Sequence, residues 1–260
     1  MAIARDNNLY FSYTGTTSGN QPYAIGGTNT SLVAFTVNEG GTNDINAPTF
    51  NSVALTEIGT AVQNGTSGRY LRGWILVNAP VGTFNFVSTR GSSNSTQVVL
   101  ASWSDVLQSA PDNQNTAQFA SGSVSPATIS LTPVANNCWV ILAVHAERAL
   151  TAGTGSNLVN GTASSFQIFD SDAPITPAAS YSMSFSQSAD TGTVCAKYLS
   201  IAPRTITIVS SELQLSTDIV TEQIGLIATD VSTSNDTVAP KVGWATTTKS
   251  VTTWTTQPKS

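Results

Sequence analysis

Residues Cys138–Ala146 read CWVILAVHA and form the most apolar segment of the chain. The segment is far too short to span a bilayer as a helix. A short, continuous apolar run is typical of a strand with both faces covered, whereas a half-buried strand alternates apolar and polar side chains. The segment therefore predicts a central strand of an all-β fold.

The segments around it show the same kind of pattern. Tyr70–Val77 (YLRGWILV) is an apolar run that ends at the turn sequence Asn78–Gly82, and Thr83–Thr89 then alternates with a period of two. Further short strands are expected at 32–37, 53–55, 97–103, 127–131, 165–169, 181–185 and 194–201. No stretch combines helical apolar spacing with caps at both ends. We predict a two-sheet antiparallel β-sandwich, jelly roll or immunoglobulin-like, over residues 1–203.

The chain is polar without being highly charged. Charged residues make up 10% of its 260 residues, and the net charge is −5. Ser, Thr and Asn supply most of the polarity, as in Ser92–Thr96. The ten basic residues are scattered singly, which argues against nucleic acid and anionic membranes as partners. The N-terminal residues lack the apolar core of a secretion signal, so we expect a soluble protein made in a cytoplasm.

Residues able to perform catalysis or bind metal are sparse. His145 is the only histidine, and a lone histidine at a strand end is more often a hydrogen-bonded structural residue than a catalyst. Asp170-Ser171-Asp172 is a close carboxylate pair, but it lacks the further oxygen donors of a calcium loop. Isolated acids such as Glu57, Asp105 and Glu147 have no evident partner for glycoside cleavage. We therefore expect no enzymatic activity, no cofactor and no metal.

The two cysteines, Cys138 and Cys195, lie in apolar runs. They would serve either as a disulfide or as two small buried side chains. The second interpretation is favoured, because disulfides are rare in cytosolic proteins.

A boundary at Ala202-Pro203 separates the sandwich from a C-terminal segment, 204–260. This segment contains a candidate edge strand at 205–209, a polar linker at 230–236 and a short repeat at its end. The sequence 244–250 (WATTTKS) returns ten residues later as 254–260 (WTTQPKS).

The repeat predicts an attachment arm. Tryptophan is a frequent anchor at protein interfaces, so an extended, docked arm is favoured over a disordered tail. We take Trp244, Lys249, Trp254 and Lys259 as the partner-binding residues.

Several motifs together resemble a known class of protein. Phe50–Gly59 (FNSVALTEIG), Arg69–Thr83 and Val98–Asp105 (VVLASWSD) resemble a β-sandwich module of tailed-bacteriophage structural proteins and bacterial surface proteins. Ser102–Val106 departs from the last element of that pattern, and the resemblance covers about residues 25–203. The two Trp-Lys-Ser sequences also resemble the endings of phage virion proteins.

The resemblance implies a structural component of a bacteriophage virion, assembled in the host cytoplasm. We expect a capsid-exterior decoration or head-fibre protein that binds other virion proteins through its arm and forms a homo-oligomer. A tail component is an alternative. A carbohydrate-binding module for host attachment is another, with Tyr10, Tyr13, Tyr23 and Tyr70 as candidates for stacking on a host surface glycan.

Overall fold

The computed structural model describes residues 2–65, 68–120, 126–160, 165–188 and 192–204. Every regular element within these ranges is a β-strand, and all strand pairs are antiparallel, which confirms the predicted all-β fold. No helix among the described residues has the length and apolarity needed to cross a membrane. The expected C-terminal arm lies outside the described residues.

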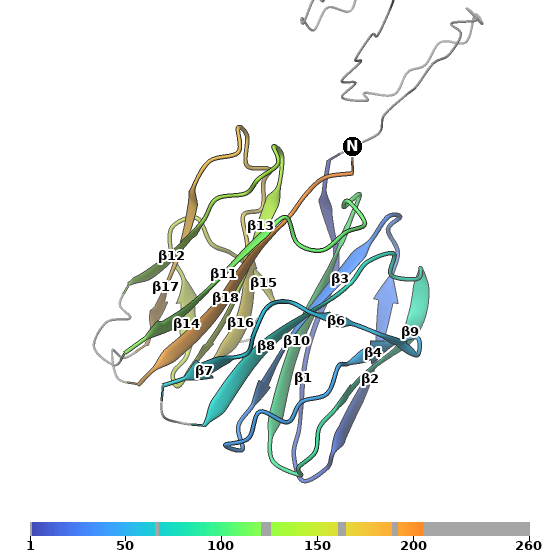
Figure 1. Ribbon diagram of the computed structural model, residues 1–260, viewed down its shortest axis with the longest axis vertical. Coiled ribbons are helices and arrows are strands. Elements are labelled where there is room, and N and C mark those ends of the chain that lie inside the picture. Colours follow the sequence, from blue (N-terminus) through green and yellow to red (C-terminus); the bar gives the residue numbers. More distant parts are fainter. Residues whose placement is uncertain (1, 66–67, 121–125, 161–164, 189–191, 205–260) are drawn as a thin grey trace, which may run out of the picture. The chain divides into compact units, whose positions relative to one another are not determined.

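Two sheets are formed by residues 4–104 (Figure 1). Sheet A has the order β1 (Ala4–Tyr13), β10 (Thr96–Ser104), β3 (Ser31–Asn38), β8 (Arg69–Leu76), β6 (Thr56–Glu57), and β7 (Val62–Asn64) also pairs with β8. Sheet B has the order β2 (Ser18–Ile25), β9 (Gly82–Thr89), β4 (Thr49–Phe50), β5 (Val53–Ala54). Apolar side chains of both sheets form one core between them.

Two more sheets are formed by residues 113–201. Sheet C has the order β11 (Asn113–Phe119), β18 (Val194–Ile201), β13 (Trp139–Ala146), β16 (Phe166–Asp170), β15 (Asn157–Asn160). Sheet D has the order β12 (Ala127–Leu131), β17 (Tyr181–Gln187), β14 (Leu150–Ala152). Sheets C and D enclose a second core.

The two sandwiches share one topology. In the first sandwich, β1 pairs with β10 and β10 with β3, while β2 pairs with β9 and β9 with β4. In the second sandwich, β11 pairs with β18 and β18 with β13, while β12 pairs with β17 and β17 with β14. This strand order is that of a jelly roll, so the structure distinguishes between the two predicted topologies. The sequence predicts one sandwich, whereas the structure shows a pair in tandem. Both belong to a single compact unit.

A third core lies between sheets A and C, and we call this contact the seam. Along β13, Ile141 and Ala143 belong to the seam core, whereas the neighbouring side chains Val140, Leu142 and Val144 belong to the core shared with sheet D. Every residue of β13 is buried, as predicted for Cys138–Ala146. β3 and β18 are buried along their whole lengths in the same way, because sheets A and C are covered on both faces.

An ion pair crosses the seam. Asp170 on β16 is fully buried, and its carboxylate accepts hydrogen bonds from Arg5 Nη2 at 2.6 Å and Nε at 3.1 Å. The indole Nε1 of Trp103 on β10 donates to the same carboxylate at 3.2 Å. Arg5 and Trp103 belong to sheet A, so this one carboxylate links the two sandwiches.

Replacing Asp170 with asparagine is expected to lower the free energy of unfolding by about 2–4 kcal/mol, because the indole of Trp103 and the guanidinium of Arg5 lose their buried anion. Denaturant unfolding of the purified chain measures the change. Asp172→Asn is the matched control. Asp172 also contacts Arg5, but its side chain is 60% exposed, so the loss there should stay below about 1 kcal/mol. Equal losses in the two variants would contradict the assigned role of Asp170.

Candidate functional site

The single histidine lies inside the seam. His145 is completely buried on β13, its Nδ1 lies 3.3 Å from the amide nitrogen of Asn64 on β7, and its ring meets Phe166 edge-on. Burial, reinforced by the charge of Arg69, lowers the pKa of His145 to about 3. The imidazole is therefore neutral at physiological pH and is shielded from solvent. This agrees with the structural interpretation of His145 rather than the catalytic one.

A buried lysine crosses the seam beside it. Lys197 on β18 is 3% exposed, and its Nζ donates a hydrogen bond of 2.6 Å to the carbonyl oxygen of Ile58 in the other sandwich. Burial lowers the pKa of Lys197 to about 8. Gly73 on β8 leaves room for this side chain, since a Cβ there would lie 3.3 Å from Lys197 Cδ. The ammonium group holds two backbones together and has no open face toward a ligand.

The carboxylate candidates are also committed to internal contacts. Asp170 is the buried partner of Arg5, and Glu57 forms a bidentate pair with Arg72 at 2.6 and 2.8 Å. Glu147 lies 3.7 Å from Arg69. Asp105 is the exception: its backbone carbonyl accepts from the backbone amide of Arg204, but Oδ1 of its carboxylate is buried without a hydrogen-bond partner among the described residues. Within the described residues, no group of three or more His, Cys, Asp or Glu side chains gathers as a metal site would require.

Both cysteines are buried, free thiols, as the sequence analysis favoured. Burial raises the pKa of each to about 12. The thiols therefore stay protonated and unreactive at neutral pH.

The four tyrosines proposed for sugar stacking mostly serve the cores. Tyr23 is 2% exposed, and its hydroxyl lies 2.9 Å from Ser102 Oγ. Tyr13 and Tyr10 are half-buried and pack against core clusters. Tyr70 is half-buried on β8. Tyr23 is thus excluded as a stacking platform, and Tyr10 and Tyr13 spend much of their ring surface on internal packing.

The two outer sheets differ from the inner ones in charge. None of the strands of sheet B or sheet D contains Asp, Glu, Lys or Arg. Their outward positions are instead small and polar, such as Thr128 and Ser130 on β12 and Thr83 and Asn85 on β9. The charged residues that lie on strands all belong to sheets A and C. The outer sheets therefore expose hydrogen-bonding groups but no formal charge.

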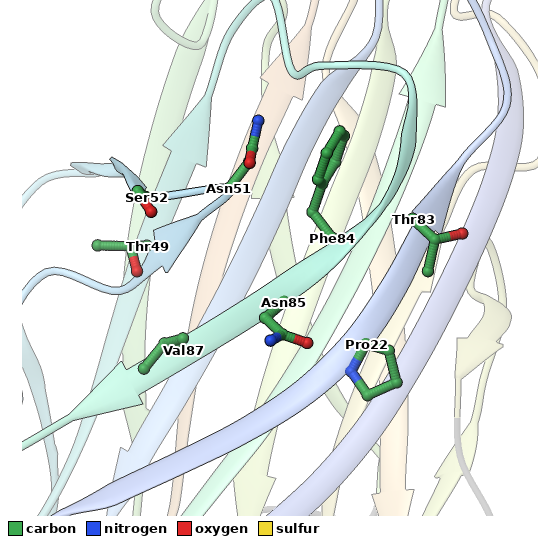
Figure 2. A pocket seen from close by; sticks show the side chains of 8 residues that line it. All are labelled: Pro22, Thr49, Asn51, Ser52, Thr83, Phe84, Asn85 and Val87. Atoms are coloured by element: carbon green, nitrogen blue, oxygen red, sulfur yellow. The ribbon is translucent and has the colours of Figure 1, made fainter.

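A hollow of about 430 Å³ lies on sheet B, where the β4–β5 turn approaches β9 (Figure 2). Eight residues line it: Pro22, Thr49, Asn51, Ser52, Thr83, Phe84, Asn85 and Val87. None of them is ionisable. The sequence pattern predicts the alternating strand at Thr83–Thr89 but not this site. The signal that was available is the pair Asn51-Ser52 between two apolar segments, which is typical of a hairpin turn.

The four residues assigned to partner binding, Trp244, Lys249, Trp254 and Lys259, lie outside the described residues. Comparison of the sequence with models of known protein families and with curated proteins finds no match.

The burial of His145 gives a direct test by NMR, because the chain has one histidine and its ring signals are unambiguous. As the pH is lowered from about 7 to about 4, the ring should keep the chemical shifts of neutral imidazole, since burial depresses its pKa from the usual value near 6.5.

The unfolded chain binds a proton at this histidine below pH 6.5 and the folded chain does not. This histidine therefore lowers the free energy of unfolding as pH falls from 6.5 toward 3, by about 1.4 kcal/mol per unit. Titration of the folded protein near pH 6.5 would contradict this burial.

Proposed function

We propose that the protein is a non-enzymatic structural component of a bacteriophage virion, displayed on the capsid exterior as a decoration or fibre-like element. The observation that carries the proposal is the fusion of two jelly rolls through a shared core. Jelly rolls recur in viral capsid proteins, and a building block of a particle needs a fixed shape. Other functions occur on the same fold, so the argument also rests on the sites.

Rigidity is the property that these contacts supply. The ion pair Arg5–Asp170, the bond from Lys197 to Ile58 and the contact between His145 and Asn64 all cross the seam. Asp170 and Lys197 are buried and hydrogen-bonded across the seam, and satisfied buried groups of this kind hold packing in one arrangement. A unit of this kind transmits load between neighbours without internal hinge motion.

The outer surfaces suit contact with other subunits. Sheets B and D expose hydroxyl and amide groups without formal charge, so packing against a neighbour does not require ions to be stripped of water. Repetition on a particle makes modest contacts effective through avidity. We expect the partners to be capsid subunits and further copies of this chain, with a tail position as the alternative.

Attachment is assigned to the C-terminal segment. The last described residue, Arg204, is fixed at the connection between the sandwiches, because its amide donates to Asp105 O and the adjacent Pro203 forms a bridge with Val106. The position of Arg204 on the double jelly roll is therefore defined. The repeated Trp244 and Trp254 supply two apolar anchors for pockets on a neighbouring subunit.

Deleting residues 242–260 should abolish incorporation into particles while the circular dichroism spectrum of the β-sandwiches is retained. A sharper variant is Trp244→Ala combined with Trp254→Ala, which removes only the two proposed anchors. The matched control is Thr247→Ala combined with Thr256→Ala within the same segment. Quantitative mass spectrometry of purified particles measures the copy number of each. Full incorporation of the tryptophan double variant would overturn the attachment model.

A further inference from the structure

The hollow on sheet B is built around a constrained turn. Asn51 and Ser52 connect β4 to β5, and both have positive φ values, 49° and 64°. This is the two-residue hairpin geometry that asparagine accepts readily and serine rarely adopts. The amide of Asn51 donates to the carbonyl of Asn85 on β9 at 3.3 Å. The turn is therefore held against β9, and one wall of the hollow is fixed before any ligand arrives.

The polar side chains of the hollow are unused. Thr49, Asn51, Ser52, Thr83 and Asn85 form no side-chain hydrogen bond with any other residue that the structure describes. Elsewhere among the described residues, amide side chains such as those of Asn38, Asn113 and Asn115 do have partners. Figure 2 shows Asn85 and Phe84 extending from opposite sides of β9, with Thr49, Asn51 and Ser52 on the neighbouring hairpin. Three hydroxyl groups and two side-chain amides can therefore donate hydrogen bonds to a ligand and accept them from it.

An apolar surface lies among these groups. Pro22 lies opposite Asn85 on the outward face of sheet B, whereas Phe84 packs against the inner core, where its ring meets Phe50 edge-on at a centroid distance of 5.7 Å. Pro22 and Val87 add aliphatic surface to the same lining. Val53 and Val81, which are 48% and 57% exposed, belong to the segments that carry Ser52 and Thr83. Apolar patches beside amides and hydroxyls are suited to a ligand with C–H faces and several hydroxyl groups.

The absence of charged side chains in the lining of the hollow restricts the class of ligand. No acid or base lines the hollow, and no strand of sheet B carries one. A phosphate, a carboxylate or an ammonium ligand would lose hydration without gaining an opposite charge. The volume of about 430 Å³ is in the range of small-molecule pockets. A neutral, hydroxyl-rich ring compound meets all of these conditions.

We propose that this hollow is a binding site for a neutral pyranose unit of a glycan. One sugar face lies against Pro22, which shares the outward face of sheet B with Asn85, and the ring hydroxyls exchange hydrogen bonds with Asn51, Ser52 and Asn85. The site lies on a different part of the chain from the proposed attachment segment. Glycan binding at this site and the structural function in the particle can therefore be tested independently.

The test is a titration of the full-length, ¹⁵N-labelled chain with the methyl glycosides of glucose, galactose, mannose and N-acetylglucosamine, followed by NMR. Single sugars bind shallow sites at about millimolar Kd. At least one of these probes should shift the side-chain amide signals of Asn51 and Asn85. Binding should be unchanged by added NaCl, because no charged pair contributes to it. Methyl glucuronide should bind more weakly than the matching neutral glucoside.

Asn85→Ala should weaken binding of the active glycoside at least tenfold, since Asn85 is exposed and its removal leaves the core intact. Thr128→Ala on sheet D is the matched exposed-strand control and should bind like the parent chain. Particle incorporation of Asn85→Ala should be unchanged, which separates this site from the attachment segment. Three outcomes would overturn the proposal: no shift with any of the four neutral glycosides, full binding by Asn85→Ala, or preference for the glucuronide.

Discussion

Sheets A and C pack face to face, and this contact determines which strands are buried on both faces and which polar side chains need partners inside the protein. Because each of these sheets also covers an outer sheet, strands such as Trp139–Ala146 are buried on both faces and alternate between two cores. Polar side chains at the seam have no water to bind, so they must find partners across it. Asp170 and Lys197 do so with groups of the other sandwich, and His145 does so through Nδ1 alone, since its Nε2 has no hydrogen-bond partner among the described residues.

The same contact explains where charge is found. Of the charged residues on strands, all lie on the inner sheets, where Arg5–Asp170 and Glu57–Arg72 are close pairs. The outer sheets have one face toward solvent and use Thr, Ser and Asn there. Such surfaces remain similar over a wide range of pH and salt concentration, since they carry nothing that titrates or is screened. This property suits a protein that works through its surfaces, whether the neighbour is a subunit or a neutral glycan.

The sequence predicts the elements better than their assembly. The apolar run Cys138–Ala146 and the alternation of Thr83–Thr89 identify strands correctly, because side-chain periodicity reports local burial. A strand buried on both faces does not reveal which sheets cover it, so the run predicts burial but not a second sandwich. The hollow was missed because it depends on the approach of Asn51 to Asn85, which are far apart in the sequence. The attachment residues beyond Arg204 remain a prediction from sequence.

The central claim is that the seam makes two jelly rolls into one rigid unit. Differential scanning calorimetry of the full-length chain tests it most directly. If the seam core couples the sandwiches, the double jelly roll should unfold in one transition whose calorimetric enthalpy equals its van't Hoff enthalpy. Two separate transitions, each with the enthalpy of about half of the double jelly roll, would contradict the claim.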